Sequence, residues 1–206
     1  MLKHEIIELV NKNNYEAFSI KDVISLSSYD NLRKNLERMT KEGSIRRIIR
    51  GIYDIPKYNN IFNMYNVPSI NGVANALARN FNWNIYPSGN AALNILGLST
   101  QIPSKYIYIS SGPYRKYECE NIIIEFKHAS QNETNSFSYN TNLIIQALKE
   151  LGKDNVNDEV LSMISKKYSS IELNNIIEEA QNTTIWIYYK IKRMGELYNE
   201  KNSNNE

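Results

Sequence analysis

The chain has little of the chemistry on which metal centres, disulfides and covalent catalysis depend. Its 206 residues include one cysteine and two histidines, too few for an intrachain disulfide or for a zinc site with the usual ligands. No phosphate-binding loop, HExxH helix or GxSxG turn occurs in the sequence. We therefore expect no metal, no cofactor, no catalytic residue and no enzymatic activity.

Long apolar runs are also missing. No window approaches 18 uninterrupted apolar residues, so we expect no membrane-spanning helix and no membrane partner. The opening run, MLKHEIIELV, contains charges that a signal peptide would lack. A chain of this size without disulfides is typical of intracellular proteins. These features together predict a cytoplasmic location.

A few reactive side chains remain as candidates. His128 lies at the expected end of a strand and could serve as a general base, but such a residue is more often hydrogen bonded and partly buried. Neighbouring acids should raise the pKa of the Cys119 thiol, which argues against a reactive thiolate. Glu118, Glu120 and Glu125 fit one exposed face of a strand pair better than a catalytic carboxylate pair.

Charge is nearly balanced overall but uneven along the chain. The formal net charge is +2, whereas residues 30–50 alone hold 7 basic and 3 acidic side chains. A local cluster of cations on a near-neutral protein is the electrostatic pattern of a polyanion-binding surface. The question is therefore which elements present these cations.

The third of three predicted helices carries part of this charge. Helices are predicted over residues 2–12 and, after an N-cap at Ser19, over FSIKDVISLSS. In SYDNLRKNLERMTKEG, apolar residues recur at i, i+4 and i+7, and Gly43 provides the stop. The apolar stripe is Leu32, Leu36 and Met39, and the opposite face carries Lys34, Arg38 and Lys41.

The segment GSIRRIIRGIYDIP, residues 43–56, predicts a β-hairpin that turns at Arg50-Gly51. Three helices followed by a hairpin is the order of a winged helix-turn-helix, in which the third helix reads DNA and the hairpin is the wing. A solvated edge hairpin whose cations discourage aggregation is the alternative. On a wing, Ile45, Ile48 and Ile52 should pack inward while Arg46, Arg47 and Arg50 face phosphates.

The predicted partner is double-stranded DNA. Cations of the wing would contact phosphates, and the exposed face of the third helix would contact base edges. A monomer that reads an inverted repeat would bind as two copies per site. The predicted DNA-contacting residues are Ser28, Tyr29, Asn31, Lys34, Asn35, Arg38, Lys41, Arg46, Arg47 and Arg50.

The remainder of the chain predicts an α+β unit and a helical end. A polar stretch bracketed by prolines, residues 56–69, reads as a domain boundary. Beyond it we expect helix, strand, a helix capped by Ser88, two strands with a short charged link (113–120), a polar loop (130–140), and a helix ended by Gly152. Three more helices follow, the first capped by Asn157 and the second by Ser169 or Ser170, and then a frayed tail (201–206).

The predicted fold class is therefore α+β. It comprises an N-terminal winged helix-turn-helix (1–58), an α+β domain with a small sheet (59–152) and a helical C-terminal extension (153–206). Cations on the last helix, Lys190, Lys192 and Arg193, fit a wider DNA footprint and a solvated helix edge equally well.

The block PSGNAALNILGLSTQIPSKYIYIS, together with GSIRRIIRGIYDIPKY upstream, resembles the AbiEi-type antitoxins of abortive-infection (type IV) toxin–antitoxin systems. The resemblance covers roughly residues 20–152, and residues 153–206 depart from it. It implies a phage-defence antitoxin and transcriptional repressor that binds inverted repeats in its own promoter and neutralises a cognate, nucleotidyltransferase-like toxin encoded nearby. The residues that mark the antitoxin domain in this resemblance are Pro87, Ser88, Gly89, Asn90, Ser99, Thr100 and Gln101.

Two other functions are compatible with the sequence. The protein could be an interaction module whose winged helix and C-terminal domain bind a partner protein without sequence-specific DNA binding. It could also be an enzyme that uses the turn at Ser88–Asn90, which leads into a helix, as an anion pocket. The absence of a convincing base or metal site makes the enzyme the weakest of the three.

Overall fold

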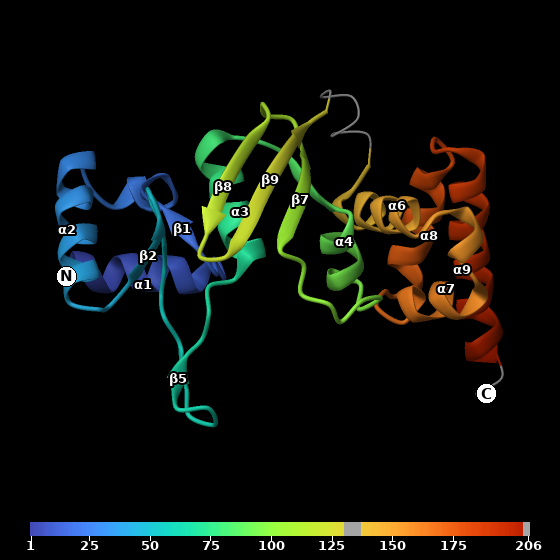
Figure 1. Cartoon of the computed structure of the whole chain (residues 1–206), viewed down its shortest axis with the longest axis horizontal. Helices are drawn as coiled ribbons and strands as arrows, with labels where there is room; N and C mark the ends of the chain where they lie inside the picture. Colours follow the sequence, from blue (N-terminus) through green and yellow to red (C-terminus); the bar gives the residue numbers. More distant parts are fainter. Residues whose placement is uncertain (130–136, 204–206) are drawn as a thin grey trace. The chain divides into compact units, whose positions relative to one another are not determined.

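The computed structural model describes residues 1–129 and 137–203, with side chains as far as Glu200. It is a mixed α+β protein with helices and small sheets, as predicted at the level of fold class (Figure 1). The chain divides into two compact units: Met1–Trp83 with Tyr117–Ile124, and Asn84–Lys116 with Glu125–Glu206. This division does not follow the three segments predicted from the sequence, which stay a prediction of domain organisation.

The first unit begins with the three helices and the hairpin that the sequence predicts, together with a short strand, β1, that it does not predict. They are α1 (Leu2–Lys12), β1 (Phe18–Ser19), the 3₁₀ helix η1 (Ile20–Leu26), α2 (Tyr29–Lys41), β2 (Arg46–Ile49) and β3 (Ile52–Asp54). The three strands form one sheet in the order β1-β3-β2. Ser19 caps η1 in a capping box with Asp22, and Gly51 turns the β2–β3 hairpin with φ +82°, a value that favours glycine. The core contains Ile6, Val10, Phe18, Val23, Leu32, Leu36, Met39 and Ile45.

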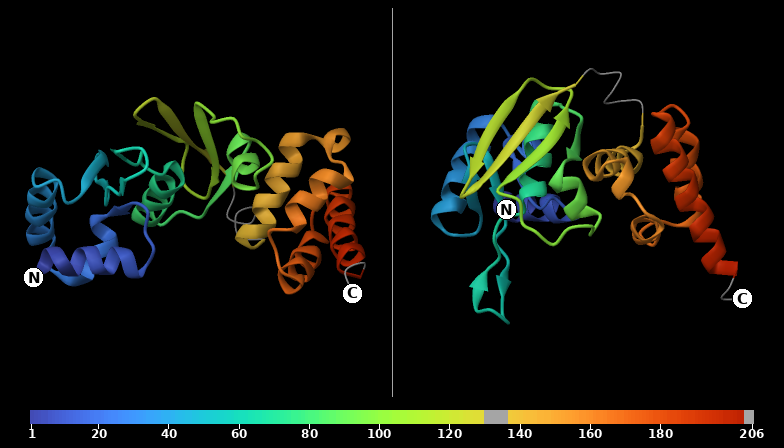
Figure 2. Two further views of the ribbon diagram at one scale, coloured as in Figure 1. Left: turned by 90° about the horizontal axis from the view of Figure 1, so that it is seen from below. Right: turned by 45° about the vertical axis from the view of Figure 1, so that its right-hand side comes forward.

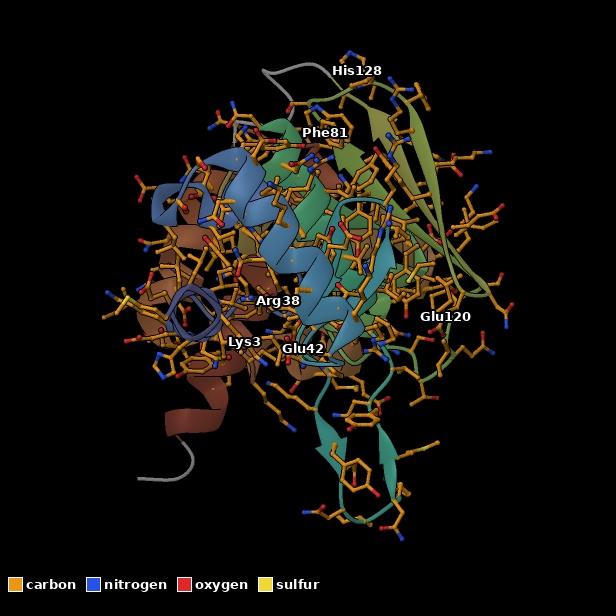
Figure 3. All side chains as sticks on the ribbon, turned by 90° about the vertical axis from the view of Figure 1, so that its left-hand side faces the viewer. Lys3, Arg38, Glu42, Phe81, Glu120 and His128 are labelled. Atoms are coloured by element: carbon orange, nitrogen blue, oxygen red, sulfur yellow. The ribbon has the colours of Figure 1, made fainter. Side chains whose placement is uncertain are left out.

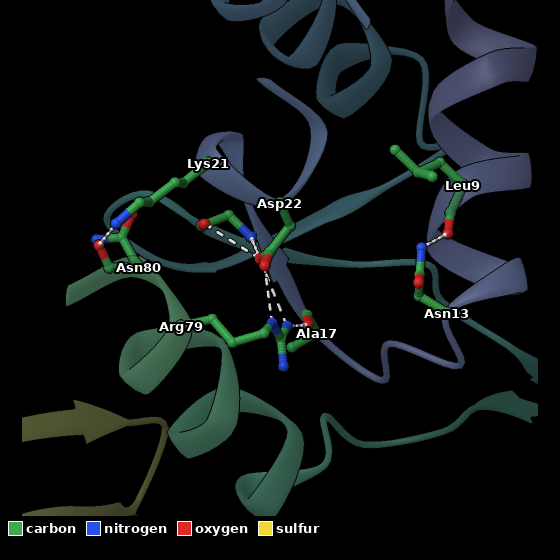
Figure 4. A network of polar contacts seen from close by, with 8 residues as sticks. Leu9, Asn13, Ala17, Lys21, Asp22, Arg79 and Asn80 are labelled. Atoms are coloured by element: carbon green, nitrogen blue, oxygen red, sulfur yellow. Dashed lines mark hydrogen bonds and ion pairs between the residues drawn. The ribbon is translucent and has the colours of Figure 1, made fainter. Parts of the chain in front are cut away.

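Helix α3 (Ile70–Phe81) packs within the first unit, although the sequence placed it beyond the domain boundary. A Cβ on Gly72 would lie 2.7 Å from Glu16 Cβ, so only glycine permits this close approach. Arg79 Nε donates to Asp22 Oδ1 (2.7 Å) and its Nη2 donates to the Ala17 carbonyl (2.8 Å) (Figure 4). These contacts between distant segments leave no signal in local composition.

A second hairpin lies in the segment predicted to be a domain boundary. Strands β4 (Tyr58–Asn59) and β5 (Met64–Tyr65) pair with each other in a two-stranded sheet of their own. The hairpin extends away from the other elements of its unit in Figure 1 and in the right-hand view of Figure 2. Strands of two residues are too short to produce a detectable alternation of apolar and polar side chains.

The larger sheet has the order β6-β7-β9-β8. Its strands are β6 (Ile85–Ser88), β7 (Lys105–Ser110), β8 (Arg115–Cys119) and β9 (Ile122–His128), and the short α4 (Asn90–Ile95) follows β6. Strand β8 replaces the predicted charged link. Its sequence, RKYEC, is rich in charge because β8 lies at the edge of the sheet, where charges discourage pairing with other molecules.

Helices build the rest of the second unit, in orange and red in Figure 2. They are α6 (Tyr139–Leu151), the 3₁₀ helix η2 (Lys153–Asn155), α7 (Asp158–Ser165), α8 (Ser170–Ala180) and α9 (Ile185–Ser203), and they share a core with α4. The predicted N-cap at Asn157 is confirmed, and Ser169 is the cap of α8. Parts of the predicted polar loop and tail, residues 130–136 and 204–206, lie outside the described residues.

Over the described ranges, no helix has both the length and the apolar character needed to cross a bilayer. The same residues contain no group of His, Cys, Asp and Glu side chains able to hold a metal ion.

Candidate nucleic-acid interface

Helix α2 has one buried and one exposed face. Leu32, Leu36 and Met39 are buried as predicted, and they anchor the helix to the core of the first unit. Asp30 lies in the first turn and Arg38 and Lys41 in the last, which suits the helix dipole. The other predicted contacts on this helix are half-buried at Asn35 and exposed at Ser28, Tyr29, Asn31 and Lys34.

A chain of hydrogen bonds runs along this exposed face. Asn31 Nδ2 donates to Ser27 Oγ (2.9 Å), and Asn35 Nδ2 donates to Asn31 Oδ1 (3.0 Å). Arg38 Nη2 then donates to Asn35 Oδ1 (2.7 Å). The amides that would read base edges are therefore held in fixed orientations before any ligand arrives, which lowers the ordering cost of binding.

Two carboxylates form ion pairs with Arg38 and Lys41 of α2. Arg38 Nε lies 3.8 Å from Glu42 Oε1, and Lys41 Nζ lies 3.0 Å from Glu37 Oε1. Lys3 of α1 donates to the other oxygen of Glu42 (2.9 Å), and this bond lowers the pKa of the Glu42 carboxyl (Figure 3). The i,i+4 spacing could have revealed the two pairs within the helix, whereas nothing in the sequence links Lys3 to Glu42.

Arg46 does not face outward as the sequence predicts. The β2–β3 register places it opposite Asp54, whose carboxylate is buried and accepts from Arg46 Nε (3.1 Å) and Nη2 (2.5 Å). The same Nη2 donates to the Asn66 carbonyl (3.1 Å). The hydrogen bonds that Arg46 donates to Asp54 raise the pKa of Arg46. Arg46 is thus a structural cation that joins the two hairpins of the first unit.

Arg47 and Arg50 are exposed, as predicted for a wing. The register shifts between Arg47 and Ile49, so Ile48 is only half-buried while Ile45 and Ile52 are fully buried. Among the residues that the structure describes, Arg47, Arg50 and Lys34 take part in no hydrogen bond or ion pair of their side chains. Of the six cations predicted to contact DNA, these three are available to an anionic ligand without breaking a contact among the described residues, and the exposed Arg33 of α2, which the prediction omitted, is available in the same way.

The second block of motif residues lies in the other unit, around α4. Ser88 belongs to β6, and its Oγ donates to Gln146 Oε1 (3.1 Å). The N-cap of α4 is Gly89 rather than Ser88, because φ +60° at this position suits glycine. The Glu150 carboxylate lies 3.7 Å from where a Gly89 Cβ would stand. A carboxylate beside the turn disfavours a bound anion there.

The other motif residues flank the same helix. Pro87 is buried in β6 and Asn90 is the exposed first residue of α4. The side chain of Asn94, on α4, donates to the carbonyls of Ser99 (3.2 Å) and Gln101 (2.6 Å). The loop that carries Ser99, Thr100 and Gln101 is therefore fixed to α4, with Thr100 and Gln101 exposed.

The DUF6088 family model, described as a family of unknown function, matches residues 5–176. The chain belongs to this family. The match includes all ten predicted DNA-contacting residues and the whole block around α4. No curated protein matches the chain in sequence.

The reactive side chains of this DUF6088 member are engaged in structural contacts. Cys119 is buried, and burial, followed by the charge of Glu120, raises the pKa of its thiol as predicted. His128 Nδ1 lies 2.9 Å from the Gly112 carbonyl. Glu125 is buried rather than exposed as expected, and a hydrogen bond from Lys105 lowers its pKa.

The cations of α9 are mostly engaged as well. Arg193 contacts Asp158 and Glu200, each at 2.8 Å, and Lys190 donates to the Val156 carbonyl. Lys192 is exposed. These contacts favour the solvated helix edge over a wider DNA footprint, because a phosphate would have to compete with carboxylates already in place.

Proposed function

We propose that the protein binds double-stranded DNA through its first unit, folded as a winged helix-turn-helix, and represses its own transcription at promoter inverted repeats. The observation that carries the proposal is a group of exposed cations without a side-chain partner among the described residues, which includes Lys34 on α2 and Arg47 and Arg50 on the β2–β3 hairpin. The order α1, η1, α2, β2, β3 and the sheet order β1-β3-β2 support it, since winged helices place the recognition helix just before the wing.

Phosphate contacts supply most of the affinity in this proposal. Each neutralised phosphate contributes about −0.9 to the slope of log K against log salt. The three unpaired cations therefore give a slope of roughly −3, and release of Arg38 and Lys41 from their carboxylates extends it to roughly −4 to −5. Base readout comes from Asn31 and Asn35, whose amides can make paired hydrogen bonds to adenine.

The resemblance described above extends the proposal to an antitoxin that acts in the cytoplasm and has no enzymatic activity. The ordered loop over Ser99–Gln101, fixed by Asn94, is the surface of the second unit that we assign to toxin neutralisation. Co-expression with a neighbouring nucleotidyltransferase-like toxin tests this part. Growth should be restored by the wild type and by a Lys34/Arg47/Arg50→Ala variant, because those cations lie in the other unit. Failure of both proteins to restore growth removes the antitoxin function.

A protein-interaction module is the second candidate, and one observation favours it. The β4–β5 hairpin exposes large apolar side chains, and exposed apolar patches mark interaction surfaces. Tight binding to a partner protein without any preference among DNA sequences distinguishes this candidate from the repressor.

The decisive experiment for the repressor compares a duplex from the protein's own upstream region with an unrelated duplex of equal length at the same salt concentration. We expect the upstream duplex to bind at least about 100-fold more tightly, within the range of specific binding. An Asn31/Asn35→Ala variant should lose most of this preference while it keeps its affinity for unrelated DNA. Lys192→Ala, which removes an exposed cation from α9, is the matched control. Equal affinity of the wild type for both duplexes contradicts the proposal.

A further inference from the structure

The β4–β5 hairpin carries an unusual concentration of exposed apolar surface. Six of its large apolar side chains have exposed fractions between 52% and 86%. They are Tyr58, Ile61, Phe62, Met64, Tyr65 and Val67. Apolar side chains in solvent are common one at a time, but a contiguous group of them marks an interaction surface.

The hairpin is nevertheless a defined structure. Asn59 Oδ1 accepts hydrogen bonds from the backbone N–H groups of Ile61 (3.0 Å) and Phe62 (3.3 Å), which fixes the turn. The Asn66 N–H donates to the Lys57 carbonyl (2.9 Å). At the root, Arg46 holds the Asn66 carbonyl. The apolar tip is thus presented in one conformation from a fixed base.

Covering this surface would stabilise the hairpin. Its two strands form a separate sheet, and an isolated two-stranded hairpin is only marginally stable in water. The rings of Tyr58 and Tyr65, with centroids 5.2 Å apart, pack edge to face across the strands. A partner that packs on these rings and on the tip would bury the apolar side chains and add support to the hairpin.

Charge limits the kinds of partner that fit. Residues 58–78 contain no charged side chain, so the hairpin offers no cation for phosphates, and DNA is disfavoured as its ligand. Absence of charge is a property of interface cores between proteins. It also lets two identical hairpins meet without like-charge repulsion, a requirement for a contact of one surface with itself across a two-fold axis.

The available area suits a dimer. Large apolar side chains offer roughly 150–200 Å² each, so the six exposed fractions give roughly 600–800 Å² per copy. A standard protein interface buries about 800 Å² per partner. This area, counted over every face of the hairpin, is an upper limit on what a second copy covers, and it approaches the area that a stable dimer needs.

We infer that the β4–β5 hairpin is a dimerisation arm, and that two copies of this chain associate through their arms about a two-fold axis. The inference of a dimer depends only on the observations of the hairpin. A role of the dimer in DNA binding depends on the proposed function, because a two-fold dimer places two recognition helices on the two halves of an inverted repeat. The Arg46 contact to Asn66 then couples the arm to the wing.

Sedimentation analysis of the full chain without DNA, over a range of protein concentrations, tests the arm. The wild type should show a concentration-dependent monomer–dimer equilibrium, and Ile61→Ser/Phe62→Ser should weaken dimerisation by at least about 100-fold. The matched control, Ile102→Ser/Ile171→Ser, removes two equally exposed isoleucines from the other unit and should leave dimerisation unchanged. A wild type that stays monomeric, or equal effects of the two double variants, overturns the inference.

Cross-linking provides a second readout that does not depend on the serine variant folding. In a Cys119→Ser background, Phe62→Cys should form a disulfide-linked dimer under mild oxidation, whereas Ile102→Cys should not. Absence of the Phe62→Cys cross-link overturns the inference. It is also overturned if Ile61→Ser/Phe62→Ser loses affinity for DNA while its dimerisation is unchanged. A wild-type dimer that does not prefer its upstream DNA overturns the repressor function and leaves the arm intact, so the two failures are distinguishable.

Discussion

The β2–β3 and β4–β5 hairpins of the first unit are close in sequence but opposite in chemistry. The β2–β3 hairpin carries three arginines and joins a three-stranded sheet backed by helices, whereas β4–β5 forms a separate two-stranded sheet and has no charged residue in its strands or turn. The β2–β3 hairpin can carry exposed cationic side chains because its buried isoleucines pack on the core and stabilise it. The β4–β5 hairpin, which does not pack in this way, exposes apolar side chains, and their burial against a partner would be favourable.

Arg46 is on β2 and contacts both hairpins. Its contact with Asp54 explains why its role differs from that of the other two arginines. Its partner Asp54 is buried, and a buried carboxylate needs a cation and hydrogen bonds to be tolerated. The neighbouring Arg47 has no such partner among the described side chains. Adjacent arginines in one strand therefore have different roles, one structural and one available to a ligand.

The largest expected effect separates these two arginines. Arg46→Ala leaves Asp54 buried without its cation and should lower the free energy of unfolding by about 2–3 kcal/mol, less than for a fully buried pair since Arg46 is partly exposed. Arg47→Ala should change it by less than about 0.5 kcal/mol. Urea unfolding of both variants measures the difference. Equal destabilisation would remove the distinction between the two roles.

A change at each turn compares how firmly the hairpins are coupled to the fold. Gly51→Ala forces alanine into φ +82° and should cost about 1–2 kcal/mol in urea unfolding, although no atom lies within 4 Å of the added methyl group. Asn63, at φ +49° in the β4–β5 turn, should tolerate alanine with a loss below about 0.5 kcal/mol in global unfolding, because β4–β5 is a separate two-stranded sheet whose strain is not shared with the core. A larger loss at Asn63 would show that β4–β5 unfolds with the core.

Removal of a carboxylate near the exposed cations should strengthen the binding of DNA. Glu42→Gln frees Arg38 and removes a negative charge close to the expected phosphates, so affinity for the upstream duplex should rise about 3- to 10-fold at low salt. Glu8→Gln makes the same change in net charge on the exposed side of α1 and serves as the control. Fluorescence anisotropy measures both. Equal gains would mean that only the total charge matters.

The smallest expected effect is the pH dependence of stability that Cys119 causes. This residue is a probe of the β2–β3 hairpin, because the charges of Arg46 and Asp54 both act on its thiol. Burial raises the pKa of Cys119 in the folded state, so the unfolded chain loses this proton first as the pH rises. This contribution to the free energy of unfolding is complete below about pH 8.5, the ordinary pKa of a thiol, and is lost as the pH rises above that value. Urea unfolding at pH 7.5 and 9.5 should show a smaller decrease for Cys119→Ser. Identical decreases would contradict this origin.

Local patterns predicted some parts of the molecule and not others. The stripe of Leu32, Leu36 and Met39 follows from helical periodicity, and the turn at Arg50-Gly51 follows from glycine between two runs of β-formers. The Arg46–Asp54 pair depends on the register of β2 against β3, which includes an irregularity that no local pattern encodes. The contact of α3 with Glu16 and Asp22 joins segments about 60 residues apart, beyond the reach of any window.

Of the candidate interface, the exposed face of α2 and two of the three hairpin arginines lie where the sequence predicts. The i,i+4 spacing could have revealed that carboxylates already hold Arg38 and Lys41, whereas the sequence could not show the Arg46–Asp54 pair, because that pair depends on the register of two strands. Nor did any pattern indicate the apolar arm, because its asparagines and the prolines on either side of it are typical of a linker.

The salt dependence of binding to the upstream duplex tests the central claim most directly. The comparison needs only the wild type, Arg47→Ala/Arg50→Ala and the arm variant Ile61→Ser/Phe62→Ser, each with a duplex that contains a single half-site. Loss of two phosphate contacts should make the slope of log K against log salt shallower by roughly 2, whereas the arm variant should keep the wild-type slope. An unchanged slope for the arginine variant would contradict the assignment of the β2–β3 hairpin as the DNA-contacting wing.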